Sequence, residues 1–170
     1  MTNKLSLDVR MSRTGDALQI EFEGKNTLDQ RIYVADKLVK SNGRNDYTTV
    51  DGAIVMNHDE PGVSKDIVKI VIGQEGTDRE TASVPSPTYR PVEPGGAVVG
   101  KVRVPYPLKS WHPLGGTNPL RPSTKVLFKL YYFVGEPKKW ITYPSSTQGP
   151  IQIPDGIAKK LFQTSPLPMP

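Results

Sequence analysis

Residues 4–26 read KLSLDVRMSRTGDALQIEFEGKN, and this stretch decides the class of fold. Apolar and polar residues alternate over residues 5–12, and a second alternating run follows over residues 18–23. A period of two residues is typical of a half-buried β-strand. Thr14, Gly15 and Asp16 lie between the two runs and favour a turn. We therefore expect a hairpin of two amphipathic antiparallel strands.

Similar strand signals recur along the rest of the chain. We expect strands in residues 31–39, 52–57, 66–74, 97–108 and 125–135, and short edge strands in residues 140–143 and 151–153. Many short strands with little helical pattern are typical of two antiparallel sheets packed face to face. The sequence therefore predicts an all-β fold, an immunoglobulin-like or fibronectin-like antiparallel β-sandwich of about seven to nine strands.

One short helix is expected near the C-terminus. Asp155 can cap residues 155–163, DGIAKKLFQ, where apolar residues recur at helical spacing on one face. The last six residues, SPLPMP, favour an extended conformation because three of them are prolines. At 170 residues the chain is long enough for one domain and short for two. We expect a single β-sandwich domain over residues 1–164 and an extended Pro-rich tail over residues 165–170.

Residues 20–34, IEFEGKNTLDQRIYV, place an asparagine-containing turn between two expected strands. In this arrangement the stretch resembles many bacterial immunoglobulin-like domains, including the group similar to intracellular proteinase inhibitors. The resemblance implies a fold for this part of the chain and no particular function. The chain has no cysteine, so the Cys…Trp…Cys pattern of antibody domains is absent.

Composition excludes several classes of protein. Without cysteine the chain cannot use a disulfide framework, cysteine-based zinc sites, iron–sulfur clusters or thiol catalysis. Hydrophobic residues make up 36% and charged residues 23% of the chain, as in ordinary soluble proteins. The N-terminus lacks the apolar segment of a secretory signal, and no apolar run approaches the ~18–20 residues of a membrane span. We therefore expect a cytoplasmic protein with no membrane partner.

Charge is distributed unevenly along the chain. The net charge is +5, but residues 1–99 carry −3 and residues 100–170 carry +8. The basic part is also rich in proline and aromatic residues, a combination that suits single-stranded nucleic acid or an anionic glycan. No Arg/Lys-rich run and no RNA-binding motif is present, so we expect no nucleic-acid partner. We interpret the uneven charge mainly as complementarity between two parts of the same fold.

The sequence contains few groups that could carry catalysis. No Gly-rich nucleotide-binding loop, GxSxG motif or HExxH motif is present. His58, Asp59 and Glu60 could offer metal ligands, but a metal site needs three or four converging ligands, and the polar surroundings favour a solvated loop. We therefore expect no catalytic residue, no metal and no cofactor. A hydrolase whose catalytic groups converge around His112 is the enzymatic alternative.

Residues 105–122, PYPLKSWHPLGGTNPLRP, are the strongest candidate for a binding site. The stretch is longer than most connections in compact domains, and unexplained length favours function. Its prolines could hold a polyproline II conformation that presents aromatic rings, or simply stiffen a connection whose tryptophan covers the core. We predict binding residues in this stretch and at one later tryptophan: Tyr106, Lys109, Trp111, His112, Arg121 and Trp140.

The sequence therefore predicts a protein that is not an enzyme. We expect a non-catalytic protein–protein interaction module, an accessory, adaptor or inhibitor-like domain that binds through loops and strand edges. The sequence does not identify the protein partner. The binding alternative is a glycan- or anionic-polymer-binding β-sandwich with Tyr106, Trp111 and Trp140 as ring platforms, beside the hydrolase alternative.

Overall fold

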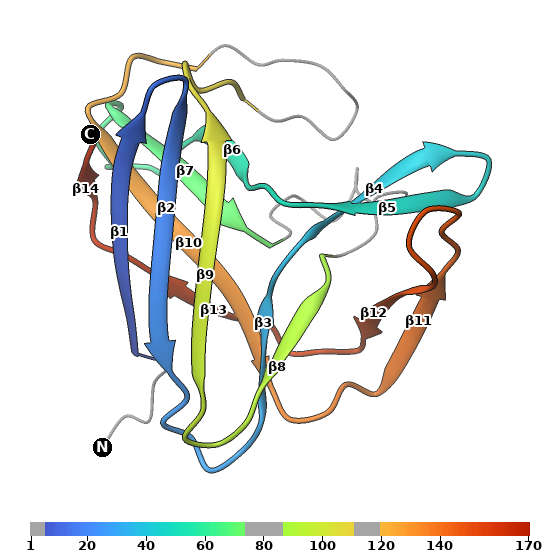
Figure 1. The fold of residues 1–170 in the computed structure, drawn as a ribbon. Coiled ribbons are helices and arrows are strands. Elements are labelled where there is room, and N and C mark those ends of the chain that lie inside the picture. The colour runs from blue at the N-terminus through green and yellow to red at the C-terminus, as the bar shows by residue number, and fades with distance from the viewer. Residues whose placement is uncertain (1–5, 74–86, 111–119) are drawn as a thin grey trace.

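The computed structural model describes residues 6–73, 87–110 and 120–170 of the chain. All regular secondary structure in these residues is β-strand, which confirms the expected all-β class. Two sheets form the main body, and two further hairpins project to one side of it (Figure 1).

The first sheet has three antiparallel strands. They are, in spatial order, β1 (Ser6–Thr14), β2 (Ala17–Lys25) and β9 (Ala97–Pro105). β1 and β2 form the expected hairpin, whose turn contains Gly15 at a φ of 56°. Leu18, Ile20 and Phe22 on β2 are buried, because the alternation puts them on the face that meets the second sheet.

The second sheet is mixed and is built around the long strand β10 (Lys125–Val134). Its other strands are β3 (Ile32–Ala35), β6 (Ile54–Asn57), β7 (Ile67–Ile72), β8 (Tyr89–Val92), β13 (Lys160–Gln163) and β14 (Leu167–Pro168). β7 runs parallel to β10, whereas the expected sandwich was antiparallel throughout. The long segment that follows β7 in the chain makes this possible, since a parallel pair needs a crossover rather than a tight hairpin.

β7 and β3 lie one after the other along the same edge of β10. Leu130 pairs with both Ile72 and Phe162, and two residues later Tyr132 pairs with both Val34 and Lys160. Because β13 occupies the same edge of β10 at both positions, β7 and β3 must follow each other along the opposite edge. The buried pattern of β10 agrees with this central position, which its run of apolar residues predicts.

The two sheets pack face to face around one hydrophobic core. Side chains from β1, β2 and β9 meet those from β3, β7 and β10 in a single cluster of buried residues. The rings of Phe22 and Phe128, one from each sheet, lie 5.8 Å apart between centroids. This contact places the centre of the core between β2 and β10.

Two hairpins form a smaller lobe, which we call the two-hairpin lobe. It contains β4 (Leu38–Gly43) with β5 (Asp46–Val50), and β11 (Lys139–Tyr143) with β12 (Ile151–Asp155). A separate apolar cluster joins them, in which Val39 packs with Ile151 and Ile153. The rings of Tyr47 and Tyr143 meet edge to face at 5.0 Å between centroids.

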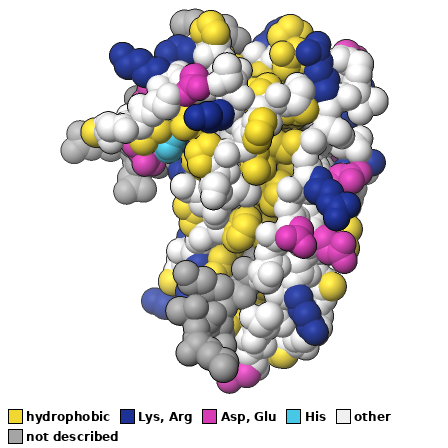
Figure 2. All heavy atoms as spheres, turned by 90° about the vertical axis from the view of Figure 1, so that its left-hand side faces the viewer, with side chains coloured by type: hydrophobic (Ala, Val, Ile, Leu, Met, Phe, Trp, Pro, Cys, Tyr) yellow, Lys and Arg dark blue, Asp and Glu magenta, His cyan; other side chains and the backbone are white. Residues whose placement is uncertain are grey.

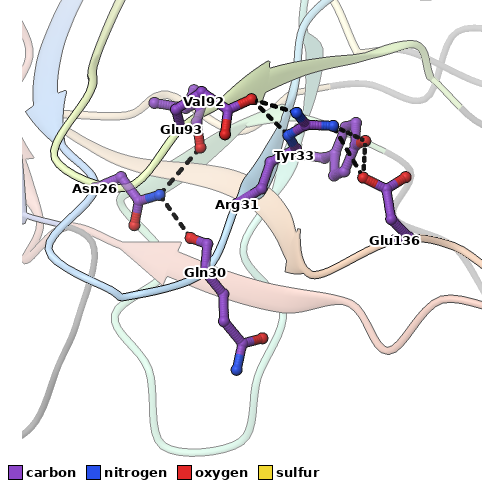
Figure 3. Close-up of polar contacts among 7 residues, drawn as sticks. All are labelled: Asn26, Gln30, Arg31, Tyr33, Val92, Glu93 and Glu136. Atoms are coloured by element: carbon purple, nitrogen blue, oxygen red, sulfur yellow. Dashed lines mark hydrogen bonds and ion pairs between the residues drawn. The ribbon is translucent and has the colours of Figure 1, made fainter.

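A buried asparagine ties the connections at the end of the sheets (Figure 3). The Asn26 side chain is fully buried and donates hydrogen bonds to the carbonyl oxygens of Gln30 at 2.9 Å and Val92 at 3.0 Å. Its Oδ1 accepts a bond from the Leu28 amide at 3.0 Å. All of its polar atoms are therefore used, as burial requires.

An exposed arginine lies beside this asparagine and bridges two connections (Figure 3). Arg31 contacts Glu93 at 2.5 Å and Glu136 at 3.0 Å, and Glu136 also accepts a bond from the Tyr33 hydroxyl at 2.7 Å. These contacts hold the connection before β3 against those after β8 and β10.

The expected C-terminal helix is wrong. No helix occurs in the described residues, and the second half of residues 155–163 forms β13, paired antiparallel with β10. The unpaired edge of β10 offers a ladder of backbone bonds that a short helix would leave unused. In the strand, Phe162 turns inward and packs on the core while Leu161 faces outward with 41% of its surface exposed. The following residues remain extended, and β14 pairs with the start of β10.

Candidate functional site

The candidate site begins where β9 ends. The Tyr106 amide donates a hydrogen bond to the Asp16 carbonyl oxygen at 2.7 Å, which fixes the chain just beyond the strand. Tyr106 and Pro107 are joined by a cis peptide bond. The guanidinium of Arg13, at the end of β1, lies 3.9 Å from the centre of the Tyr106 ring. This cation–π contact holds the ring at the edge of the three-stranded sheet.

A cavity of about 230 Å³ lies beside this segment. Three stretches of chain line it together with one residue of β7: Tyr106, Pro107 and Leu108 from the first, Leu120, Arg121, Pro122 and Ser123 from the second, Met169 from the C-terminal end, and Val68. Most of these side chains are apolar, and Leu108, Leu120 and Met169 pack on the main core. The cavity is therefore an extension of the core that opens to the surface.

Arg121 forms the polar wall of the cavity and is held by residues at the end of β6 and just after it. Its Nη1 contacts Asp59 Oδ1 at 2.6 Å, and its Nη2 donates to the His58 carbonyl oxygen at 3.4 Å. The Arg121 amide donates to Asn57 Oδ1 at 3.0 Å. These bonds leave only a third of the Arg121 side chain exposed, so the guanidinium is a fixed group rather than a mobile one.

Asp66 holds the chain next to the lining residue Ser123. Thr124 donates to the Asp66 carboxylate through its hydroxyl at 2.6 Å and to the Asp66 carbonyl through its amide at 2.9 Å. Hydrogen bonds from the hydroxyls of Ser64 and Thr124, in that order of size, lower the pKa of the Asp66 carboxyl. The carboxylate is therefore ionised at neutral pH and keeps the segment that precedes β10 in place.

The structure brings two of the predicted binding residues into one place, since Tyr106 and Arg121 both line the cavity. Lys109 is exposed and lies one residue beyond the cavity-lining Leu108. Trp111 and His112 lie outside the described residues.

Trp140 belongs to a different part of the molecule. It lies on β11, which Figure 1 shows at the other end from the segment that follows β9. Its ring packs edge to face on Tyr33, with 5.6 Å between centroids, and it is half-buried against the main core. Tyr106 and Trp140 therefore do not form one surface.

Asp59, the acidic residue near the cavity, forms an ion pair. Asp59 faces Arg121, and the His58 side chain is 6% exposed with its Nε2 3.9 Å from Glu60. Within the part of the chain that the structure describes, no three His, Asp or Glu residues are grouped as metal ligands would be. His58 and Asp59 therefore hold Arg121 in place.

Sequence reasoning did not find several residues that line the cavity. Val68 lies on β7 and Met169 near the C-terminal end, both far from residues 105–122 in the sequence, and no local pattern connects them to that stretch. Leu108, Leu120 and Pro122 lie within that stretch, but an isolated apolar residue in a loop carries no signal of its own. Only the length of the stretch and its aromatic and basic residues pointed to this end of the molecule.

Comparisons with known proteins give no relative for this chain. It matches no family model, no curated protein and no solved structure. The described residues contain no helix that is long and apolar enough to cross a membrane.

Proposed function

We propose that the chain is a non-catalytic protein–protein interaction domain that holds an apolar side chain of a partner protein in the cavity beside Tyr106 and Arg121. The observation that carries the proposal is a cavity lined mainly by apolar residues, with Arg121 held in its wall by hydrogen bonds. Binding residues are commonly found on loops that a rigid β-scaffold positions.

The size of the cavity favours a side chain over a cofactor. A volume of about 230 Å³ is smaller than the ~300–1,000 Å³ of pockets that bury small-molecule ligands. It suits one large or two small apolar side chains. In protein interfaces such anchoring side chains provide most of the binding energy when they enter a desolvated pocket.

The surroundings of the cavity suit the rim of a protein interface. Arg121 lines one wall, the exposed Arg13 lies against the Tyr106 ring, and the exposed Lys109 follows the lining residue Leu108. An apolar centre with a polar rim is the usual anatomy of such an interface, and arginine and tyrosine are enriched there. Among the described residues that line the cavity there is no carboxylate and no histidine, the side chains that most often act as a general base.

The strand order supports a finer proposal for the main body. In immunoglobulin-like domains strands A, B and E form one sheet, and strand C pairs with F in the other. Here β1, β2 and β9 form one sheet, and β3 pairs with β10 antiparallel in the other. We propose that the main body is an immunoglobulin-like variant, with β6 and β7 and the two-hairpin lobe as additions.

An affinity-capture experiment with matched variants tests the interaction. The bait proteins are the wild type, Leu120→Lys in the cavity and Val99→Lys as control, since Val99 is 62% exposed on β9. Proteins captured from a lysate of the native cells are identified by mass spectrometry, and each is then purified and titrated by calorimetry. We expect Leu120→Lys to weaken binding of the partner by about tenfold or more while Val99→Lys leaves it unchanged.

Further measurements keep this test decisive. Leu108→Lys changes another lining residue of the cavity and should have the same effect as Leu120→Lys, with thermal unfolding confirming that both variants fold. Equal affinities for the wild type and both cavity variants would contradict the proposed site. Turnover of any substrate in a hydrolase panel by purified wild type would contradict the non-catalytic role.

A further inference from the structure

β1 is an open edge of the three-stranded sheet. All nine residues of the strand pair with β2, and no other described strand pairs with it. Open edges are usually blunted by proline, a bulge, short length or charged side chains, and the charges on β1 are of both signs. β1 has no proline and no register shift, whereas β8 contains Pro91, and β9 carries Lys101 and Arg103 and ends at Pro105. Among the described edge strands, β1 is therefore the long one that remains available for pairing.

An apolar band borders this edge. Figure 2 views the side on which Figure 1 places β1 and β14, and it shows hydrophobic side chains running down that face. Val9 and Met11 on β1 are only partly buried, and so is Met169 just after β14, although all three pack on the core. A strand added beside β1 would cover apolar surface as well as complete the backbone ladder.

The outward face of β1 carries two opposite charges without partners. Asp8 lies directly opposite Glu23 on β2, so two acids face each other across the strands. Arg10 lies opposite Glu21, but Glu21 contacts Lys101 at 3.3 Å and accepts a bond from Gln19. Within the described residues, neither Asp8 nor Arg10 forms an ion pair. Like charges directly opposite each other destabilise a sheet unless a neighbouring strand compensates them.

We propose that β1 pairs antiparallel with β1 of a second copy of this chain, around a two-fold axis at Val9. In this register Asp8 of each copy lies opposite Arg10 of the other, and Leu7 lies opposite Met11. The two unpartnered charges of one copy are then matched by those of the other, and apolar residues meet apolar residues on the inner face. The same surface serves both copies, as a two-fold interface requires.

Other registers of the same pairing are poorer. A shift of one residue would turn the apolar face of one strand toward the charged face of the other. An axis at Asp8 sets two acids against each other, and an axis at Arg10 sets two arginines against each other. An axis at Met11 places Val9 opposite the exposed Arg13 and removes the Asp8–Arg10 pairs. Of these registers, charge and polarity together favour the axis at Val9.

The paired sheet would have six strands, in the order β9–β2–β1–β1–β2–β9. Since the two-fold axis is perpendicular to the sheet, the larger sheets of both copies lie on the same side of it. The apolar bands of the two copies then meet beneath the new pair of strands. Met169 lines the cavity and also belongs to the apolar band, but Leu108 and Leu120 lie outside the β1 pairing, so variants at those residues and variants in β1 test the partner site and the dimer separately.

A single cysteine tests the register, because the chain has no cysteine of its own. Directly opposed residues have Cα atoms ~4.5–5.5 Å apart, within reach of a disulfide. We expect Val9→Cys to form a covalent dimer on mild oxidation at low micromolar concentration. Ser12→Cys is the control, because the two Ser12 residues would lie about 20 Å apart in this register and should not crosslink.

Two charge-reversal variants, tested alone and mixed, probe the proposed Asp8–Arg10 pairs. Arg10→Asp and Asp8→Arg each place like charges opposite each other and should weaken dimerisation by about tenfold or more in analytical ultracentrifugation. When the two variants are mixed, every opposed pair is again acid against base. We expect the mixture to form a heterodimer even though each variant alone is mainly monomeric, which also shows that both variants fold.

Three results would overturn the proposal. The wild type could stay monomeric at the highest concentration it reaches. The Ser12→Cys variant could crosslink as readily as Val9→Cys, which would place the two copies in another register. The mixed charge variants could remain monomers while the wild type forms a dimer, which would place the interface elsewhere.

Discussion

Phe22 lies over Gly100, its partner in the register between β2 and β9, and its ring fills the space that a side chain at position 100 would occupy. The same ring lies 5.8 Å from that of Phe128 in the opposite sheet. A glycine in the middle of an alternating strand is otherwise unfavourable, because it has no side chain to pack. Here its absence of a side chain lets the largest residue of β2 reach the centre of the core.

Gly100→Ala should therefore destabilise the domain. The added Cβ would overlap the Phe22 ring, and crowding of this kind in a packed core costs about 1–3 kcal/mol. Urea unfolding measures the change in the free energy of unfolding. Gly52→Ala is the control, since its Cβ would meet only the Leu38 side chain at an ordinary 3.6 Å. Equal stability of the two variants would contradict the overlap.

Tyr89→Phe should stabilise the domain or leave it unchanged. The Tyr89 hydroxyl is buried without a hydrogen-bond partner among the described residues, and burial raises the pKa of Tyr89 well above its ordinary value. Phenylalanine removes the unsatisfied group but keeps the ring contact with Phe133 at 5.0 Å. The expected gain is up to about 1 kcal/mol by urea unfolding.

Tyr33→Phe provides the matched comparison. The Tyr33 hydroxyl donates to Glu136 at 2.7 Å, while its ring stacks on the same Phe133 at 4.8 Å. Loss of this bond should cost about 1 kcal/mol, so the two tyrosines should respond with opposite signs. A larger loss at Tyr89 than at Tyr33 would show that the Tyr89 hydroxyl has a partner in solution.

Asn26→Leu should be among the most destabilising single substitutions in this end of the fold. The change keeps the approximate size of the side chain but leaves the carbonyl oxygens of Gln30 and Val92 without their donor. The Leu28 amide loses its acceptor as well. Because each buried unsatisfied group costs about 1–3 kcal/mol, we expect a loss of at least about 2 kcal/mol in urea unfolding. Asp29→Ala, at an exposed position three residues along, serves as the control, and a similar loss there would contradict the special role of Asn26.

The three-stranded sheet was predictable because its signal is local. The alternation around Leu7, Leu18 and Ile20 specifies both the strands and the buried face, and the structure follows it. β10 was equally clear, because its apolar residues on both faces require a central position. In both cases the information lies within ten residues or fewer of the chain.

Other features depend on residues far away in the sequence. β5 has no apolar alternation, and it is held in part by Gln148, whose Oε1 accepts a bond from the Thr49 amide at 2.9 Å. β13 replaced an expected helix because the edge of β10 was open. At the candidate site, the sequence singled out Tyr106 and Arg121, but Met169 reaches the cavity only because β14 pairs with β10. Such long-range pairings leave no periodic pattern to read.

Acid should loosen the two-hairpin lobe through Asp46. The Asp46 carboxylate accepts bonds from the Ser146 amide at 2.7 Å and the Ser146 hydroxyl at 3.0 Å, and so joins the two hairpins. Chiefly because of the bond from the Ser146 amide, the pKa of Asp46 lies below its ordinary 3.8. A lowered pKa in the folded state means that this contribution is fully present above about pH 3.8 and is lost as the pH falls through the lowered value.

The Ser146 amide resonance reports this titration directly by NMR. We expect its chemical shift to move with a midpoint below pH 3.8, and amide exchange in β5 to speed up over the same range. Asp46→Asn should abolish the titration and give the loosened lobe at every pH, since a neutral acceptor binds the amide more weakly. The Thr49 amide, bonded to the neutral Gln148, should not titrate in this range. A Ser146 midpoint at or above 3.8 would show that the carboxylate does not hold the two hairpins together.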